Sequence, residues 1–358
     1  MKILQVITTL LMGGAEKLIV DMVPMYQVQG HQVDVLLFDG TETPFRKQLE
    51  EKGVKIYELG RGKSVYSPSF IFKLIPFLKK YDIVHTHNTA PQLFAAIGSV
   101  LCSVVLVTTE HNTSNRRRDW KWYAWVDKWM YSRYKKVICI SDKTKEHLCQ
   151  FVPGVKPKTE VIYNGINVGS YAKATPLVKT ESGSRKVLAM VAGFRYQKDQ
   201  DTVVRALSLL SKGKFELWLI GDGERRNILE TLVEQLGLSE YVKFWGIRSD
   251  VPQLLQSSDI VVMSSHWEGF GLAAVEGMAA GKPVVASDIP GVAQVVEGAG
   301  ILFPHEDAQQ LAVEIERLVE DKTYYSQVAD ACRKRADEYD ISKMVEGYIR
   351  VYNEVVVK

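Results

Sequence analysis

Short apolar runs of strand length alternate along the chain with longer segments of helical periodicity. The runs are nearly continuous in Val, Ile and Leu, a pattern typical of strands buried on both faces of a parallel sheet. They form two series, so we expect an α/β protein with two doubly wound units. The first series is Lys2–Thr8, Gln32–Phe38, Ile83–Thr86, Val104–Thr109, Lys136–Ile140 and Glu160–Tyr163, and the second is Lys186–Ala192, Glu216–Ile220, Val242–Phe244, Ile260–Met263, Pro283–Ala286 and Gly300–Phe303.

The boundary between the two series falls between Asn164 and Arg185. Residues 170–185 are small and polar, contain Pro and Gly, and show no core period, which predicts a linker. The predicted domains are residues 1–168 and 185–341. Residues 342–358 form a closing helix in this prediction, because four apolar or aromatic residues fall on one side of it: Met344, Tyr348, Val351 and Tyr352.

Composition excludes several classes of protein. The chain has 358 residues, 46% hydrophobic and 24% charged, which is ordinary for a globular protein and not for a disordered, fibrous or disulfide-stapled one. No run of about 18 apolar residues predicts a membrane span. The first residues resemble a strand and not a signal peptide. The four cysteines are scattered without CxxC spacing, which favours a reducing compartment, so we expect a cytoplasmic protein.

The small net charge of +3 conceals an asymmetry between the two halves. Residues 1–180 contain 25 Lys and Arg against 15 Asp and Glu, whereas the remainder contains 20 basic and 27 acidic residues. Such segregation is expected when one half faces an anionic surface.

The strongest local motif is His266-Trp-Glu-Gly-Phe-Gly-Leu-Ala-Ala-Val-Glu276, which follows the apolar run Ile260–Met263. We expect a loop leading into a helix that begins near Phe270, where glycines let backbone N–H groups approach an anion. Glu276 would lie about two turns along this helix, where a carboxylate can bind a ribose diol. The alternative is a solvent-facing glutamate pair on an ordinary helix.

Gly13 and Gly14 form a second glycine turn, between the first strand and a helix expected near Ala15. Such a turn suits a phosphate or a sugar acceptor, although it is also compatible with a plain strand–helix connection. The third glycine of a dinucleotide fingerprint is missing, and neither Asp34 nor Asp39 fits the expected ribose-binding acid. A nicotinamide oxidoreductase is therefore disfavoured.

Most of the seven histidines need no functional explanation. His85 and His87 alternate along a predicted strand, but no neighbouring carboxylate or thiol completes a metal site, so we expect them to be structural. His111 follows the run Val104–Val107.

Residues 115–136 combine four tryptophans and eight Lys or Arg with only two Asp. Trp122, Trp125, Val126 and Trp129 recur at helical spacing, and an aromatic face bordered by cations is typical of interfacial helices. We expect this segment to contact an anionic membrane surface. The alternative is that the tryptophans pack in the core. Nucleic acid is not expected as a partner, because no groove-reading module is present.

The chain resembles the retaining glycosyltransferases of family 4, which have the GT-B fold: two Rossmann-like domains with a cleft between them. The resemblance covers nearly the whole chain, and the most specific landmark is the glutamate pair with its Gly-Phe-Gly insert. The landmarks occur in order: Gly13-Gly-Ala-Glu16, Glu110-His-Asn-Thr113, Ile138-Cys-Ile-Ser141, Tyr163-Asn-Gly-Ile166, Lys198-Asp199, Gly221-Asp-Gly223, Glu268 to Glu276, and Ala279-Ala-Gly-Lys-Pro283.

The resemblance implies a donor site in the C-terminal domain. Glu268 would hydrogen-bond the donor sugar, and Glu276 the nucleotide ribose. Lys198 matches the lysine that stabilises the departing diphosphate. The family arginine, five positions earlier, is Gly193 here, and Arg195 would supply the guanidinium instead. Backbone amides would complete the donor site at Gly269, Phe270, Gly271 and Leu272, with Gly14 contributed by the N-terminal domain.

The resemblance also assigns roles to the N-terminal domain, onto which the C-terminal helix is expected to pack back. His111 matches a histidine near the donor sugar, so the implied catalytic residues are His111, Lys198 and Glu268. The implied acceptor-binding residues are Gly13, Gly14, Glu16 and Asn112. No metal or cofactor is expected, because GT-B enzymes generally need no bound metal.

The implied reaction is transfer of a hexosyl unit with retention of configuration and without a covalent carboxylate nucleophile. The expected donor is a nucleotide-sugar, with a UDP-sugar favoured. The expected acceptor is a sugar or lipid-linked sugar in polysaccharide or glycolipid biosynthesis, at the inner face of the cell membrane. Two alternatives remain open: a nucleotide-sugar epimerase, and a catalytically silent nucleotide-sugar-binding module.

Overall fold

The computed structural model describes residues 1–11, 13–62, 64–111, 120, 123–177 and 185–356. The chain divides into two compact units. Unit 1 comprises Met1–Gly165 together with Ile341–Lys358, and unit 2 comprises Ile166–Asp340.

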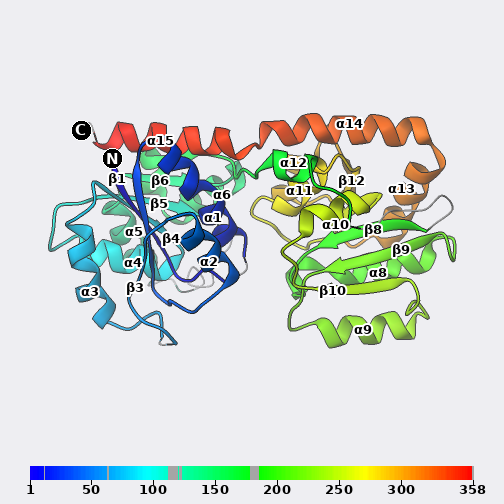
Figure 1. Cartoon of the computed structure of the whole chain (residues 1–358), viewed down its shortest axis with the longest axis horizontal. Helices are drawn as coiled ribbons and strands as arrows, with labels where there is room; N and C mark the ends of the chain where they lie inside the picture. The colour runs from blue at the N-terminus through cyan, green and yellow to red at the C-terminus, as the bar shows by residue number, and fades with distance from the viewer. Residues whose placement is uncertain (12, 63, 112–119, 121–122, 178–184, 357–358) are drawn as a thin grey trace. The chain divides into compact units, whose positions relative to one another are not determined.

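The described part of unit 1 contains a seven-stranded parallel sheet of order β3-β2-β1-β4-β5-β6-β7 (Figure 1). Its central strand β4 is fully buried, and β1 and β5 are buried except at their first residues. The six predicted strands are present, and β3 was not predicted because it is three residues long, at the sheet edge and only partly buried. The strands are β1 (Lys2–Ile7), β2 (Gln32–Leu37), β3 (Ile56–Glu58), β4 (Ile83–His87), β5 (Val105–Glu110), β6 (Lys136–Cys139) and β7 (Thr159–Val161).

Helices flank this sheet and cover a core that includes Leu4, Val84 and Leu106. The closing helix α15 packs beside α1 within unit 1 and buries Met344, Tyr348, Val351 and Tyr352, the predicted apolar side (Figure 1). The helices are α1 (Gly14–Val28), α2 (Pro44–Glu51), α3 (Ser69–Leu78), α4 (Thr89–Gly98), α5 (Tyr123–Ser132), α6 (Asp142–Phe151) and α15 (Ile341–Val356).

Unit 2 contains a parallel sheet of order β10-β9-β8-β11-β12-β13 in its described residues (Figure 1). All six strands of the second predicted series are present, within a few residues at each end. They are β8 (Lys186–Val191), β9 (Phe215–Ile220), β10 (Val242–Gly246), β11 (Ile260–Met263), β12 (Val284–Ser287) and β13 (Ile301–Phe303). The flanking helices are α7 (Val168–Ala172), α8 (Gln200–Leu209), α9 (Arg226–Gln235), α10 (Val251–Ser257), α11 (Leu272–Ala279), α12 (Pro290–Val296), α13 (Ala308–Glu320) and α14 (Lys322–Glu338).

The start of the predicted linker is folded. Residues 168–172 form α7, which packs on α10 and α11 and buries Tyr171. Asn167 caps this helix, because its side-chain oxygen accepts a hydrogen bond from the N–H of Ser170 at 3.1 Å. A five-residue helix with one buried aromatic is too short to produce a core period in the sequence. Residues 178–184 lie outside the described part of the chain.

Candidate active site

Lys198 and Glu268 meet at the point where the strand order of unit 2 reverses. Lys198 ends a short 3-10 turn (Tyr196–Lys198) after β8, and Glu268 follows β11, the neighbouring strand. Open parallel sheets bind ligands at the carboxyl ends of their strands at such a reversal. The Lys198 ammonium forms an ion pair with the Glu268 carboxylate, and the Ser265 hydroxyl donates to the same oxygen at 3.0 Å. The structure thus brings together two predicted site residues from different strands.

Hydrogen bonds join the two loops that carry this pair. The Gln197 side-chain amide donates to the Trp267 carbonyl at 2.8 Å, and the His266 N–H donates to the Gln197 carbonyl at 2.8 Å. The Ser264 hydroxyl donates to the Asp199 carbonyl at 2.5 Å. The side chain of Glu268 is only 10% exposed and that of Lys198 is 24% exposed. The charges are therefore fixed in position by backbone contacts and largely shielded from water.

The glycine-rich turn after Glu268 leads into α11. Gly271 caps the helix with a φ of 86°, a left-handed conformation that glycine adopts at no steric cost. The helix begins at Leu272 and not near Phe270, so Glu276 lies little more than one turn from its start, and the prediction of two turns was wrong. Phe270 is buried and packs edge-on against Tyr339, with ring centroids 5.2 Å apart. The ring anchors the turn, so that the first amides of α11 and the turn amide of Gly269 are held at the carboxyl edge of the sheet.

Glu276 is held from outside its own helix. The Tyr171 hydroxyl on α7 donates to its carboxylate at 2.7 Å. The neighbouring Gln256 side chain donates to the Tyr171 carbonyl at 2.8 Å. Glu276 is therefore not a freely solvated glutamate, although its role as a ribose ligand remains a prediction.

The side chain of Arg195 lies close to Gly193, and its exchange for the family arginine stays a prediction. A Cβ atom built on Gly193 would lie 3.9 Å from Nε of Arg195. The guanidinium thus occupies the space beside the position from which a side chain at 193 would extend. Arg195 is exposed, and no carboxylate among the described residues forms an ion pair with it, so its charge is available to an anion.

In unit 1 an acidic side chain lies beside the glycine turn that precedes α1. Gly13 is the N-cap of α1, with an extended backbone, and Gly14 is the first helical residue. The Glu16 carboxylate lies so close to Gly13 that an added Cβ would overlap it. This acidic group reduces the attraction of the helix end for a phosphate. Asn112, the fourth predicted acceptor residue, lies outside the described residues.

His111 is partly buried and lies at the end of a chain of hydrogen-bonded groups whose other members, His87 and Gln5, are fully buried at the reversal between β1 and β4. Its Nε2 lies 2.9 Å from Nδ1 of His87, and Nε2 of His87 lies 2.8 Å from the Gln5 amide oxygen. Burial lowers the pKa of His111 to about 4 and the pKa of His87 well below the ordinary histidine value. His111 is therefore uncharged at neutral pH, and its ring is positioned by a second histidine.

The same chain of groups continues to the closing helix α15. The Gln5 amide donates to the Tyr352 hydroxyl at 3.1 Å, and that hydroxyl lies 2.5 Å from Nδ1 of His85. Nε2 of His85 is hydrogen-bonded to the Thr109 hydroxyl at 2.8 Å, and that hydroxyl is hydrogen-bonded to the Tyr348 hydroxyl at 3.1 Å. His85 and His87 are thus hydrogen-bonded within the core, and their link to His111 was not predicted. The sequence contained a signal for this link. His85 and His87 share one face of β4, and His111 follows β5, the parallel neighbour of β4.

The aromatic and basic segment is described from Tyr123 onward and at Trp120. Its helix α5 buries Asp127, Met130 and Tyr131, whereas Trp125 is 77% and Trp129 41% exposed. These two tryptophans are therefore not core residues, which rules out the alternative interpretation for them. Arg133, one residue beyond the helix, donates to the Ser99 carbonyl at 2.9 Å, which fixes the end of α5 beside the exposed residues Val100 and Leu101. The predicted residues Asn115, Arg116 to Arg118 and Trp122 lie outside the described part.

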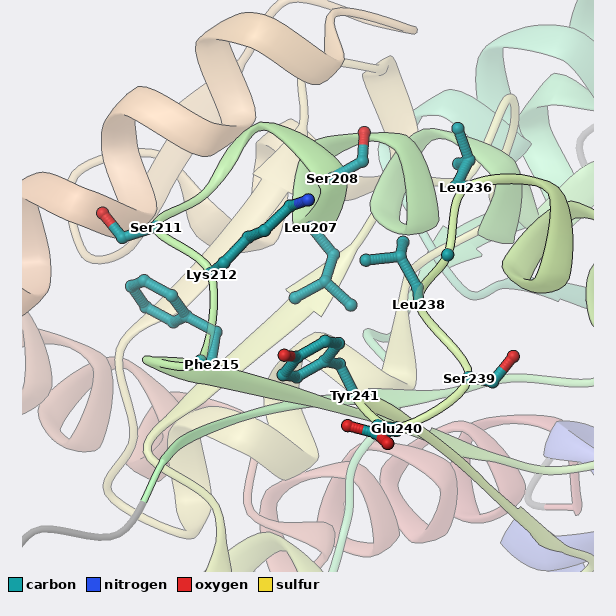
Figure 2. Close-up of a pocket in the computed structure, with 12 residues that line it drawn as sticks. Leu207, Ser208, Ser211, Lys212, Phe215, Leu236, Leu238, Ser239, Glu240 and Tyr241 are labelled. Carbon is teal, nitrogen blue, oxygen red and sulfur yellow. The ribbon is translucent and has the colours of Figure 1, made fainter.

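A pocket of about 390 Å³ in unit 2 lies away from these residues (Figure 2). Figure 2 shows Leu207, Leu238 and Tyr241 around it. Phe215, the first residue of β9, also lines the pocket, which places it at the amino edge of the sheet. Lys198 and Glu268 lie at the opposite, carboxyl edge, so this pocket is not part of the candidate site.

Family models match both halves of the chain. The model for glycosyl transferases group 1 matches residues 176–338, and the model for Glycosyltransferase Family 4 matches residues 12–170. The chain belongs to this class of glycosyltransferases and has the GT-B fold. No helix in the described residues is long and apolar enough to cross a membrane.

Two relatives illustrate the range of the family. An uncharacterized glycosyltransferase of Methanocaldococcus jannaschii is 28% identical over 356 residues, covering 90% of each chain. The Escherichia coli UDP-Gal:alpha-D-GlcNAc-diphosphoundecaprenol alpha-1,3-galactosyltransferase is 27% identical over 314 residues, covering 82% of this chain and 81% of that one. Among solved structures, Anabaena HepE in complex with UDP and glucose has a TM-score of 0.86 at 24% identity, covering 99% of this chain and 100% of that one.

Proposed function

We propose that the chain transfers a hexosyl unit from a UDP-sugar to a lipid-linked sugar, with retention of configuration and without a required metal. The Lys198–Glu268 pair at the strand reversal of unit 2 carries this proposal. The Lys198 ammonium, next to a helix N-terminus, can bind a diphosphate, and the neighbouring Glu268 carboxylate can accept a hydrogen bond from a sugar hydroxyl.

In the proposed donor site each group has a separate task. Lys198 and Arg195 stabilise the negative charge that develops as the nucleoside diphosphate departs, together with the amides at the start of α11. Glu268 accepts hydrogen bonds from the donor sugar. Glu276, oriented by Tyr171, accepts hydrogen bonds from the ribose hydroxyls. No carboxylate nucleophile is invoked, and His111 contributes a neutral ring, because burial lowers its pKa to about 4.

The choice of donor and acceptor is supported by relatives. The E. coli relative is named for a UDP-galactose donor and a diphosphoundecaprenol-linked acceptor. A Campylobacter jejuni relative, 26% identical over 61% of this chain, is named for transfer to a diphospho-undecaprenol-linked sugar. Anabaena HepE was solved with UDP-glucose. We assign Gly13, Gly14, Glu16 and Asn112 to the acceptor.

A lipid-linked acceptor requires the enzyme to reach a membrane. We propose that α5 contacts the inner face of the cell membrane, because Trp125 and Trp129 lie one turn apart and are exposed. The exposed Lys128, Arg133 and Lys135 supply cations near this pair, each worth about 1 kcal/mol beside an anionic leaflet.

The test of the reaction combines a donor panel with a defined acceptor. UDP-, GDP- and ADP-sugars are incubated with the enzyme and a diphosphoundecaprenol-linked sugar, and the anomeric configuration of the product is read by NMR. A UDP-sugar giving a product of retained configuration is expected in the presence of a chelator. Inversion, or a requirement for metal, would contradict the proposal. Epimerised sugar without acceptor would indicate the epimerase, and donor binding without any turnover would indicate the silent module.

The membrane contact has its own test. Flotation with anionic vesicles should carry the wild-type protein upward at low salt, less at high salt, and not with neutral vesicles. The double variant Trp125→Ser/Trp129→Ser should float less, while its thermal stability stays near that of the wild type. As a matched control, Phe72→Ser replaces another exposed aromatic of unit 1 and should leave flotation unchanged. Wild-type protein that remains with the soluble fraction at low salt would overturn the claim.

A further inference from the structure

Unit 2 brings two histidines and a glutamate from different loops to one point. His266 lies in the loop after β11, and His305 and Glu306 lie in the loop after β13. Nδ1 of His266 is 2.9 Å from Nε2 of His305 and 3.2 Å from Oε1 of Glu306, and the last two atoms are 4.0 Å apart. All three potential ligand atoms lie within 4.8 Å of one another.

These separations fit the first coordination shell of a small transition-metal ion. Zinc binds imidazole nitrogen and carboxylate oxygen at about 2.0–2.2 Å in tetrahedral geometry. Two ligand atoms of such a tetrahedron lie about 3.4 Å apart. The three separations here, 2.9, 3.2 and 4.0 Å, bracket that value.

An independent observation points to the same place. Oδ2 of Asp199 is buried and has no hydrogen-bond partner among the described residues. It lies 3.9 Å from Nδ1 of His266, and the Asp199 side chain is only 5% exposed. A buried carboxylate oxygen without a partner is costly, and a cation beside His266 would offset that cost.

The remaining contacts hold the central ligand in place and leave an entrance. The His266 ring packs against Tyr196, with centroids 4.5 Å apart, and its side chain is 9% exposed. His305 and Glu306 are 37% and 57% exposed, so an ion can enter from solvent on their side.

We propose that unit 2 binds one transition-metal ion of the zinc class through His266, His305 and Glu306, with Asp199 as a buried anionic neighbour. Two imidazoles with one carboxylate select zinc, cobalt or nickel over magnesium or calcium, which prefer all-oxygen sites. The ion joins the loop after β13 to the loop that presents Glu268 two residues beyond His266. The ion takes no part in the transfer reaction, so the proposal is independent of the proposed donor and acceptor.

The decisive experiment is calorimetric titration of Zn²⁺ into untagged, chelator-treated full-length protein. One ion per chain is expected, with no saturable binding of Mg²⁺ at the same concentrations. Two variants of exposed ligands, His305→Ala and Glu306→Gln, should each weaken zinc binding by about 10-fold or more. The control His147→Ala removes a histidine of α6 in unit 1 and should leave the affinity unchanged.

A second measurement identifies the ligands. Co²⁺ substituted into the wild-type protein should give the visible absorption of a low-coordinate site, and His305→Ala should lose it. Unaltered Co²⁺ absorption and zinc affinity in His305→Ala would overturn the proposal. It would equally be overturned if Zn²⁺ binding were absent, or were lost in His147→Ala, because the three side chains would then be held by ordinary hydrogen bonds.

Discussion

The two units have the same doubly wound architecture but place opposite chemistry at their strand reversals. In unit 1 the reversal between β1 and β4 holds a buried chain of uncharged groups running from His111 through His87 to Gln5. In unit 2 the reversal between β8 and β11 holds the Lys198–Glu268 ion pair beside a glycine-rich helix start.

The difference follows from how much water each site excludes. Burial makes a charged imidazole costly, and it lowers the pKa values of His85, His87 and His111. Lys198 keeps a 24% exposed side chain and an immediate partner, so a charge is tolerated there. The same fold therefore carries uncharged groups at one strand reversal and an ion pair at the other, and we predict that the first orients a ligand and the second binds an anion.

The largest effect is expected from Lys198→Ala. Removing the cation that we propose stabilises the departing diphosphate should lower kcat by about 10²–10³-fold. Lys186→Ala is the matched control, because it removes another lysine of unit 2 that pairs with a carboxylate, Asp259. Steady-state kinetics of both variants decide the point, and equal losses in the two would contradict a specific role for Lys198.

His111→Ala should lower kcat by about 10²-fold, the usual scale for one positioned active-site group. The fold should survive, since the neighbouring links from His87 to Gln5 do not pass through His111. Turnover and circular dichroism are compared with those of His147→Ala. Near-wild-type turnover in a folded His111→Ala variant would leave unit 1 with a purely structural network.

Glu276→Ala should weaken binding of the free nucleoside diphosphate by about 10–100-fold, because the ribose loses hydrogen bonds to a charged acceptor. Glu268→Ala should mainly lower turnover and bind the same ligand nearly as well. Tyr171→Phe, which removes the hydroxyl that orients Glu276, should weaken binding only a few-fold. Calorimetry with UDP separates the three, and unchanged affinity in Glu276→Ala would refute its assignment.

Acidification should destabilise unit 1 more than unit 2. The folded-state pKa of His111 is about 4, below its unfolded value near 6.5, so the unfolded chain binds more protons between these values. Stability contributed by the neutral ring is thus complete above pH 6.5 and is lost as the pH falls toward 4. At pH 5 the loss from His111 alone is about 2 kcal/mol, and His85 and His87 act in the same direction.

Hydrogen exchange followed by mass spectrometry reports each unit separately. After correction for the intrinsic pH dependence of exchange, the opening free energy of β4 and β5 should fall between pH 7 and pH 5. That of β8 and β11 should change less. Equal losses in both units would show that the buried histidines do not control the acid response.

Much of the fold was predictable because most of the strands contain a short apolar run. All twelve predicted strands are present among the described residues. Strand β3 was not predicted because it is short and partly buried, and α7 was not predicted because its residues fall at the start of the expected linker. The site residues were assigned from the resemblance, and their roles stay predictions. Lys198 and Glu268 were both assigned to the donor, but no local pattern in the sequence predicts that their side chains form an ion pair.

The sequence by itself determined the two series of parallel strands and the glycine turns, because these depend on periodicity and on local backbone chemistry, whereas the class of protein was identified by the resemblance of its motifs to a known family. The tertiary structure decided which residues are joined over long separations. His111 contacts His87, Tyr171 contacts Glu276, and His266 contacts His305. It also decided that Trp125 and Trp129 face outward while Asp127 between them is buried. Helical spacing defines a stripe of side chains, whereas only packing against the rest of the unit determines which stripe is covered.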